Sequence, residues 1–336
     1  MQAFVLTLFL LATSHPQDDA KKLEVVTTLS VLGDLAAEVG GDHVHVESLA
    51  DPRQDPHYVE PKPTLMQKAR AADLFVEVGL QLELWGEKVA SGSGNPRIQT
   101  GQPGRVIASA GVPTLELPAV LSREWGDVHP YGNPHVWLDP LNAKTMAENI
   151  SGALCKVDPA HAEDYRANLE RFQKRVDEAL FGPELVAQVG GRQLTRLARQ
   201  GRLLDYLAKE KLALGGWLAK AEPLRGRPIV TYHKTTAYLA DRFGFHVPIE
   251  IEEKPGIPPS ARHRDQVVEL MTKEKVKTIL LELFYERSAA DYLADKSGAH
   301  VVALPIDTGE AVGAKDYFAL IDKILAELVR SETSSE

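Results

Sequence analysis

Three of the eleven histidines in this 336-residue chain lie in surroundings that suit a metal ligand. His57 and His135 each follow a proline directly, and His233 follows an apolar, β-branched run at residues 228–232. Proline fixes its own φ angle and restricts the residue before it, so a Pro-His loop holds an imidazole in place at little entropic cost. If residues 228–232 form a parallel strand, His233 lies at its carboxyl end, where open α/β sheets bind ligands.

Asp307 is a fourth candidate ligand, because it follows an expected strand at residues 300–304 and precedes a loop that contains glycine. Three neutral imidazoles and one carboxylate match the tetrahedral nitrogen and oxygen ligands that Zn²⁺ accepts. Each residue alone is a weak indication, since a single histidine more often lies on the surface or makes a hydrogen bond. The hypothesis of a metal site therefore rests on His57, His135, His233 and Asp307 together.

Strand and helix patterns alternate in both halves of the chain and would position these side chains. Runs that are β-branched or alternate in polarity predict strands at residues 24–30, 43–49, 73–78, 228–232, 246–250, 277–283 and 300–304. Apolar residues at helical spacing predict helices at residues 31–39, 63–72, 83–90, 235–243, 261–273 and 317–329. Such alternation is typical of parallel β-α-β units, so we expect an α/β fold with two lobes.

The middle of the chain, at residues 142–181 and 193–221, consists mainly of helix-forming residues. Residues 159–181 have no glycine or proline between their ends and space their apolar side chains at helical intervals. A helix of this length spans about 30 Å, enough to connect two lobes. We therefore expect a signal peptide and polar lead-in at residues 1–22, an N-terminal α/β lobe at 23–157, a connecting helix and helical insertion at 158–225, and a C-terminal α/β lobe at 226–332.

The first residues have the pattern of an export signal. The apolar run at residues 3–12 is too short to span a bilayer comfortably, and small residues and then a polar stretch follow it. We expect a cleaved signal peptide with cleavage near Ser14, although no Lys or Arg precedes the apolar run. A buried first strand or helix is the alternative. No cysteine follows the run directly, so we expect no lipid anchor.

Composition excludes some classes of function. The chain is 44% hydrophobic and 25% charged, which is ordinary for a soluble globular protein. Its formal net charge of −9 and pI near 5.7 argue against a nucleic-acid partner, which would require a basic face. The single cysteine, Cys155, excludes both an internal disulfide and a thiolate metal site of the CxxC type.

The motifs together resemble the metal-specific periplasmic solute-binding proteins of ABC transporters, which handle zinc, manganese or iron. The resemblance runs from residue 23 to residue 329. It is most specific in the two Pro-His loops at residues 55–61 and 133–140, and it is similar but looser around His233 and Asp307.

This resemblance implies two Rossmann-like α/β lobes joined by a long connecting helix, with one ion in the cleft between the lobes. His57 and His135 would come from the first lobe, and His233 and Asp307 from the second. The resemblance also implies delivery of the ion to a membrane permease by a monomeric, extracytoplasmic carrier. Members with a third histidine tend to be zinc proteins, so Zn²⁺ is favoured, with Mn²⁺ or iron as the alternative.

The sequence departs from this family in three places. Some zinc members carry a long His- and Asp-rich loop before the second ligand, whereas residues 121–131 offer few such side chains. His129, in this segment, is either a solvated loop residue or an auxiliary ligand. The segment at residues 182–228 is longer than the simplest members need, and it has no assigned role. Lys254 interrupts a stretch that is usually acidic and then proline, which leaves the roles of Glu252 and Glu253 open.

Two other classes of function use similar residues. A zinc hydrolase keeps an open metal position for water and usually has three protein ligands. Four ligands from four separate loops instead suit a closed carrier site, and the chain has no HExxH, GxSxG, Walker or GxGxxG motif. We therefore expect a protein that is not an enzyme. An adhesin that keeps a metal only for structural stability is the remaining alternative.

Overall fold

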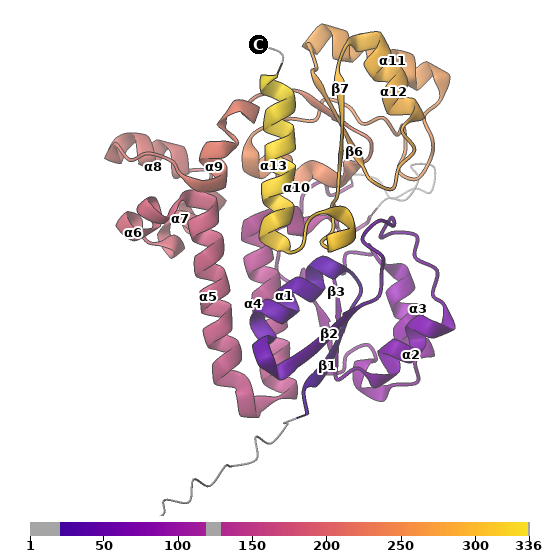
Figure 1. Cartoon of the computed structure of the whole chain (residues 1–336), viewed down its shortest axis with the longest axis vertical. Helices are drawn as coiled ribbons and strands as arrows, with labels where there is room; N and C mark the ends of the chain where they lie inside the picture. Colours follow the sequence, from indigo (N-terminus) through magenta and orange to yellow (C-terminus); the bar gives the residue numbers. More distant parts are fainter. Residues whose placement is uncertain (1–20, 119–128, 335–336) are drawn as a thin grey trace, which may run out of the picture.

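The computed structural model describes residues 21–118 and 129–334, and the expected signal peptide lies outside these residues. The first lobe contains a four-stranded parallel sheet in the order β2-β1-β3-β4. Its elements are β1 (Leu23–Thr27), α1 (Ser30–Gly40), β2 (Val44–Ser48), α2 (Pro63–Ala71), β3 (Leu74–Glu77), α3 (Leu84–Gly92) and β4 (Arg105–Ile107). Figure 1 shows this lobe below the second one, with the two lobes in contact.

The second lobe contains a three-stranded parallel sheet in the order β5-β6-β7. Its elements are β5 (Ile229–Thr231), α10 (Ala237–Phe243), α11 (Ala261–Glu274), β6 (Thr278–Glu282), α12 (Ser288–Ser297), β7 (His300–Leu304) and α13 (Tyr317–Thr333). Single turns of 3-10 helix occur at η1 (Gly41–His43), η2 (Pro96–Ile98), η4 (Val136–Leu138), η5 (Pro159–His161), η6 (Glu222–Leu224), η7 (Lys234–Thr236) and η8 (Glu310–Val312).

One central strand of each sheet is buried along its whole length. Every residue of β3 and of β6 is buried, and both strands are apolar except near their ends. Parallel strands that are covered by helices on both faces have such continuous apolar sequences. The prediction of two α/β lobes is therefore confirmed.

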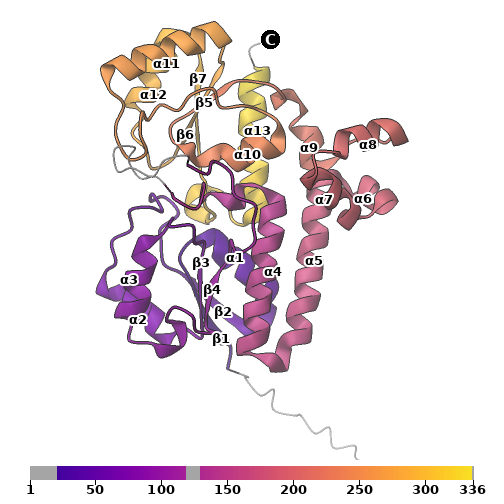
Figure 2. The same cartoon turned by 180° about the vertical axis from the view of Figure 1, so that it is seen from behind.

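Two long helices run side by side along the molecule. These are α4 (Pro140–Val157) and α5 (Ala162–Phe181), and Figures 1 and 2 show them next to each other. The start of α4 contacts the second lobe through Asp139. The Asp139 carboxylate accepts one hydrogen bond from the backbone N–H of Leu141. It accepts two more from the guanidinium of Arg242 in the second lobe, at 2.8 and 2.7 Å. Asp139 therefore caps α4 and joins the two lobes.

Four short helices follow α5 and form the helical insertion. They are α6 (Pro183–Val189), α7 (Gly191–Arg199), α8 (Leu203–Glu210) and α9 (Gly216–Lys220). A buried polar group fixes α7 against the long helices: the Lys144 ammonium donates to Asp177 at 2.5 Å and to Thr195 at 3.0 Å. No helix in the described parts of the chain is long and apolar enough to span a bilayer.

One expected strand is absent, and one strand was not expected. Residues 246–250 do not form a strand, since only isolated bridges join Pro228 to His246 and Thr231 to Glu250. Pro248 lies between these bridges and has no N–H to donate, which interrupts the ladder. The strand β4 was missed because it is only three residues long and has no clear alternation.

Removing the carboxylate of Asp177 is expected to lower the free energy of unfolding by about 3–5 kcal/mol, because Lys144 then stays buried as an unpaired cation. Both side chains are less than a tenth exposed. Urea unfolding of the metal-free Asp177→Ala variant measures this. In the matched control, Asp291→Ala breaks the exposed pair with Arg287 and should cost less than about 1 kcal/mol. Equal losses in the two variants would contradict the argument.

Candidate metal centre

The three predicted histidines meet between the two lobes. His57 lies in the loop between β2 and α2, His135 directly precedes η4, and His233 lies two residues after β5 and directly precedes η7. One ring nitrogen from each lies within 4.8 Å of those from the other two. The distances between ring centroids are 5.2, 5.4 and 5.6 Å.

The two Pro-His loops hold their histidines by the same device. In each loop the side chain two residues before the histidine accepts both its backbone N–H and its ring Nδ1. Asp55 does so for His57, at 2.9 and 2.7 Å, and Asn133 does so for His135, at 3.0 Å for both bonds. The proline between them supplies a fixed φ angle. An Asx-Pro-His sequence therefore orients its own imidazole through local hydrogen bonds.

The oxygen acceptors determine which ring nitrogen of each histidine faces the site. Burial alone raises the pKa of Asp55, but its hydrogen bonds and charge interaction with His57 outweigh this and hold the pKa below its usual value. Asp55 is thus a carboxylate and only accepts, so Nδ1 of His57 donates to it, and Nε2, which lies 3.2 Å from Nε2 of His129, is the nitrogen that would meet an ion. An imidazole held by a carboxylate or amide oxygen in this way is the usual form of a metal-binding histidine.

His233 is held from a different part of the chain. Its Nδ1 lies 2.8 Å from Oε2 of Glu252, and both side chains are buried. Burial alone lowers the pKa of His233, but the hydrogen bond and charge of Glu252 outweigh it and raise the pKa above its usual value. The sequence left the role of Glu252 open, and the structure places it against the ring of the third histidine.

His135 presents a buried nitrogen that has no partner among the described residues. The residue is 1% exposed, and its Nε2 makes no hydrogen bond there. Burial, and then the neighbouring imidazoles of His57, His233 and His129, lower the pKa of His135 well below its usual value. The ring is therefore neutral at pH 7, which is the form that binds a metal ion. A buried acceptor without a partner costs free energy, and a bound cation would satisfy it.

Asp307 lies outside the group of three histidines. Its carboxylate accepts backbone N–H groups from Val31 at 2.6 Å, Ser30 at 3.2 Å and Thr308 at 2.9 Å. It therefore sits at the N-terminus of α1, where the helix dipole favours a negative charge. Burial raises the pKa of Asp307 to about 6, against the lowering effect of these hydrogen bonds. That Asp307 binds the metal stays a prediction.

His129 lies beside the site. Its Nε2 is 3.2 Å from Nε2 of His57, and the pair is partly buried. Two imidazole nitrogens on one tetrahedral zinc ion lie about 3.3 Å apart, given a Zn–N bond of about 2.0–2.1 Å. His129 is therefore close enough to His57 for the two nitrogens to bind the same ion.

We expect His129→Ala to weaken zinc binding by about tenfold or less, because His129 lies outside the group of three histidines. Zinc titration in competition with a chelator measures the change. A loss as large as that of His57→Ala would instead make His129 a full ligand.

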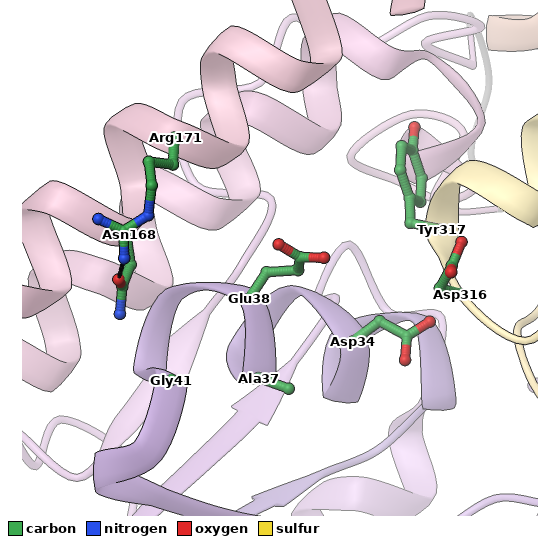
Figure 3. A pocket seen from close by; sticks show the side chains of 8 residues that line it. All are labelled: Asp34, Ala37, Glu38, Gly41, Asn168, Arg171, Asp316 and Tyr317. Carbon is green, nitrogen blue, oxygen red and sulfur yellow. Dashed lines mark hydrogen bonds between the residues drawn. The ribbon is translucent and has the colours of Figure 1, made fainter.

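Two cavities lie among the described residues, and they differ in their relation to the site. One, of about 460 Å³, adjoins the histidines, and its lining includes Asp55 and Glu252, the two carboxylates that hold His57 and His233. A cation in this cavity therefore meets negative charge next to the imidazoles. The other, of about 400 Å³, lies between α1, α5 and the start of α13, and Figure 3 shows its lining. None of the three histidines lines that second cavity.

Comparison with known proteins identifies the family. The family model described as zinc-uptake complex component A, periplasmic, matches residues 25–180 and 205–331. The iron-binding protein YfeA of Yersinia pestis is 30% identical over 93% of this chain and 87% of its own length. The zinc-binding lipoprotein AdcA of Streptococcus pneumoniae is 26% identical over 97% of this chain, which spans 59% of that relative.

A solved structure agrees on the fold. The solute-binding protein FpvC of Pseudomonas aeruginosa, in complex with Mn²⁺, superposes with a TM-score of 0.71 at 23% identity, over 94% of this chain and 100% of that one. The relatives' names include iron and zinc, so the family as a whole binds metal without one fixed ion. Its members are solute-binding proteins and not enzymes. The chain belongs to the ZnuA family of metal-binding, substrate-binding proteins of ABC transporters.

Proposed function

We propose that the protein captures one Zn²⁺ ion at His57, His135 and His233 and delivers it to the permease of an ABC transporter. The convergence of three imidazoles supports this proposal, since each has its Nδ1 held by an oxygen. The Nε2 of His135 is the strongest single observation, because it is buried and has no hydrogen-bond partner among the residues that the structure describes.

We propose Asp307 as the fourth ligand. Its carboxylate would have to exchange amide partners on α1 for the ion. The loop before it is already tied to the first lobe, since the indole N–H of Trp137 donates to the carbonyl of Ile306 at 2.7 Å. Loading would therefore change a contact between α1 in the first lobe and the loop after β7 in the second.

The choice of zinc rests on ligand chemistry. Imidazole nitrogen suits zinc, whereas manganese prefers carboxylate, carbonyl and water oxygens. The alternative cargo is manganese or iron, as the names of relatives allow. Competitive titration of the metal-free protein tests this, with Zn²⁺ and Mn²⁺ at matched free concentrations. Equal affinity for the two ions would contradict a zinc carrier.

A carrier must also release its cargo while it remains folded. Chelator treatment should leave the far-ultraviolet circular dichroism and a cooperative thermal transition intact, and added zinc should raise Tm through mass action. If the protein unfolded when the metal was removed, a purely structural metal, as in the adhesin alternative, would be favoured.

We further propose that the protein acts outside the cytoplasm as a monomer, after cleavage of the export signal. The partner in delivery is the membrane permease, and the cargo is the divalent ion. Expression of the full chain in a secreting host, followed by N-terminal sequencing of the exported product, tests the cleavage near Ser14. A product that retains Met1 in the cytoplasm would contradict this part of the proposal.

A further inference from the structure

The helical insertion presents a row of arginines. Arg192, Arg196 and Arg199 lie four and three residues apart on α7, so they share one face of the helix. Arg202 follows just after the helix, and all four side chains are exposed. We call these four residues the arginine stripe. No Asp or Glu occurs at residues 190–204.

The charge of the stripe is not compensated within the described part of the chain. None of its four arginines makes an ion pair with a residue in 21–118 or 129–334. Among the described residues, the side chain of Arg199 alone of the four donates hydrogen bonds, to the carbonyl of Leu141 and the hydroxyl of Thr145 on α4. Residues 182–215 carry six Lys or Arg against three Asp or Glu, although the whole chain has a net charge of −9.

Packing and hydrogen bonds hold α7, the helix that carries the arginine stripe, in place. The other face of α7 is buried through Leu194 and Leu197, and Thr195 joins the buried pair of Lys144 and Asp177. Figures 1 and 2 show α6, α7 and α8 on the outer side of α5, away from α2 and α3. The helix that carries the arginine stripe therefore lies on the side of the molecule remote from α2 and α3.

The stripe lies in a part of the chain that the family model does not match. The family model matches up to residue 180 and resumes at residue 205, so α6, α7 and the start of α8 fall in the unmatched gap. None of these residues contributes to the group of three histidines. A role of the stripe is therefore separate from capture of the ion.

We propose that the arginine stripe docks the protein on the surface of an anionic phospholipid bilayer. Guanidinium groups pair with phosphate in a planar, two-pronged geometry, and a bilayer offers many phosphates on one broad surface. A projecting helix face fits such a surface better than it fits a recessed site on a protein. Leu204, two residues after Arg202, is 47% exposed and supplies an apolar contact of the kind found on interfacial helices.

The expected effect is large enough to measure. Each basic residue close to an anionic membrane strengthens binding about fivefold, so the loss of three should weaken it about a hundredfold. Because the interaction is electrostatic and exposed, it should also fall steeply with added salt. Docking on this face would keep the carrier near the membrane between captures.

The test is sedimentation of the full mature protein with vesicles, in the metal-free and zinc-loaded forms. One set contains equal parts of phosphatidylglycerol and phosphatidylcholine, and the other contains phosphatidylcholine alone. The test variant combines Arg192→Gln, Arg196→Gln and Arg202→Gln, which spares Arg199 because of its contacts with α4. The control variant makes the same change of charge at exposed positions elsewhere: Lys88→Gln, Arg262→Gln and Lys273→Gln.

We expect wild type and the control variant to bind the anionic vesicles, and the test variant to bind them about a hundredfold less. Unchanged zinc affinity in the test variant would show that it is folded and that capture is independent of docking. Absence of wild-type binding to anionic vesicles would overturn membrane docking and favour an acidic protein partner instead. Equal binding by the test and control variants would also overturn it, since net charge and not the stripe would then be responsible.

Discussion

Replacement of His135 by alanine is expected to weaken zinc binding by about a thousandfold or more, equivalent to about 4 kcal/mol. Groups that only orient a ligand typically contribute ten- to a hundredfold, so a ligand itself should contribute more. His135 is the sharpest test among the three histidines because it is 1% exposed and its Nε2 has no partner among the described residues.

The same substitution should leave the metal-free fold intact. Removing the ring also removes a buried nitrogen that lacks a hydrogen bond, which offsets part of the cost of the space left behind. Urea unfolding of the metal-free variant checks this, and zinc competition with a chelator gives the affinity. The matched controls are His45→Ala and His161→Ala, whose rings pair with Glu24 and Asp158 away from the site. Wild-type affinity in His135→Ala would remove it from the ligand set.

The affinity for zinc is expected to fall more than tenfold as pH decreases from 8 to about 5.5, because protons compete for imidazole. His135 should contribute little to this loss, since its pKa already lies well below the usual value and its ring stays neutral. His233 should contribute early, since Glu252 raises its pKa and favours the protonated ring in the metal-free protein. A raised pKa extends proton competition to higher pH, and a lowered pKa removes it.

The variant Glu252→Gln separates these two effects of the carboxylate. It removes the charge that raises the pKa of His233, so the decline in affinity should begin at a lower pH than in wild type. It also weakens the hydrogen bond that orients the imidazole of His233, so the zinc affinity at pH 8 should fall about ten- to a hundredfold. Titrations across the pH range measure both. An identical pH profile in wild type and Glu252→Gln would contradict the proposed control of His233.

The lobes and the three histidines were predictable because local patterns encode them. Strands such as β6 and β7 are continuous apolar runs, and the parallel β-α-β arrangement follows from their alternation with helices. In each Asx-Pro-His sequence the residue that holds the imidazole is part of the same short motif. The roles of Asp55 and Asn133 could therefore have been predicted from the sequence. Their position two residues before each histidine indicates this role, which was not predicted.

The remaining features depend on contacts between distant parts of the chain. Nothing near Glu252 in the sequence indicates that it meets His233, nineteen residues away. The position of Asp307 depends on whether its carboxylate binds the amides of α1 or the ion, and both outcomes suit the same residues. The prediction of a strand at 246–250 failed because one proline outweighed an otherwise suitable pattern.

Native mass spectrometry with elemental analysis tests the central claim most directly. Chelator-stripped mature protein would receive limiting Zn²⁺ or Mn²⁺, and the bound metal would be counted for wild type and for the triple variant His57→Ala, His135→Ala, His233→Ala. The account predicts one tightly held zinc per wild-type chain and none in the triple variant. A folded wild-type protein that retains no stoichiometric metal, or a triple variant that retains the zinc, would contradict it.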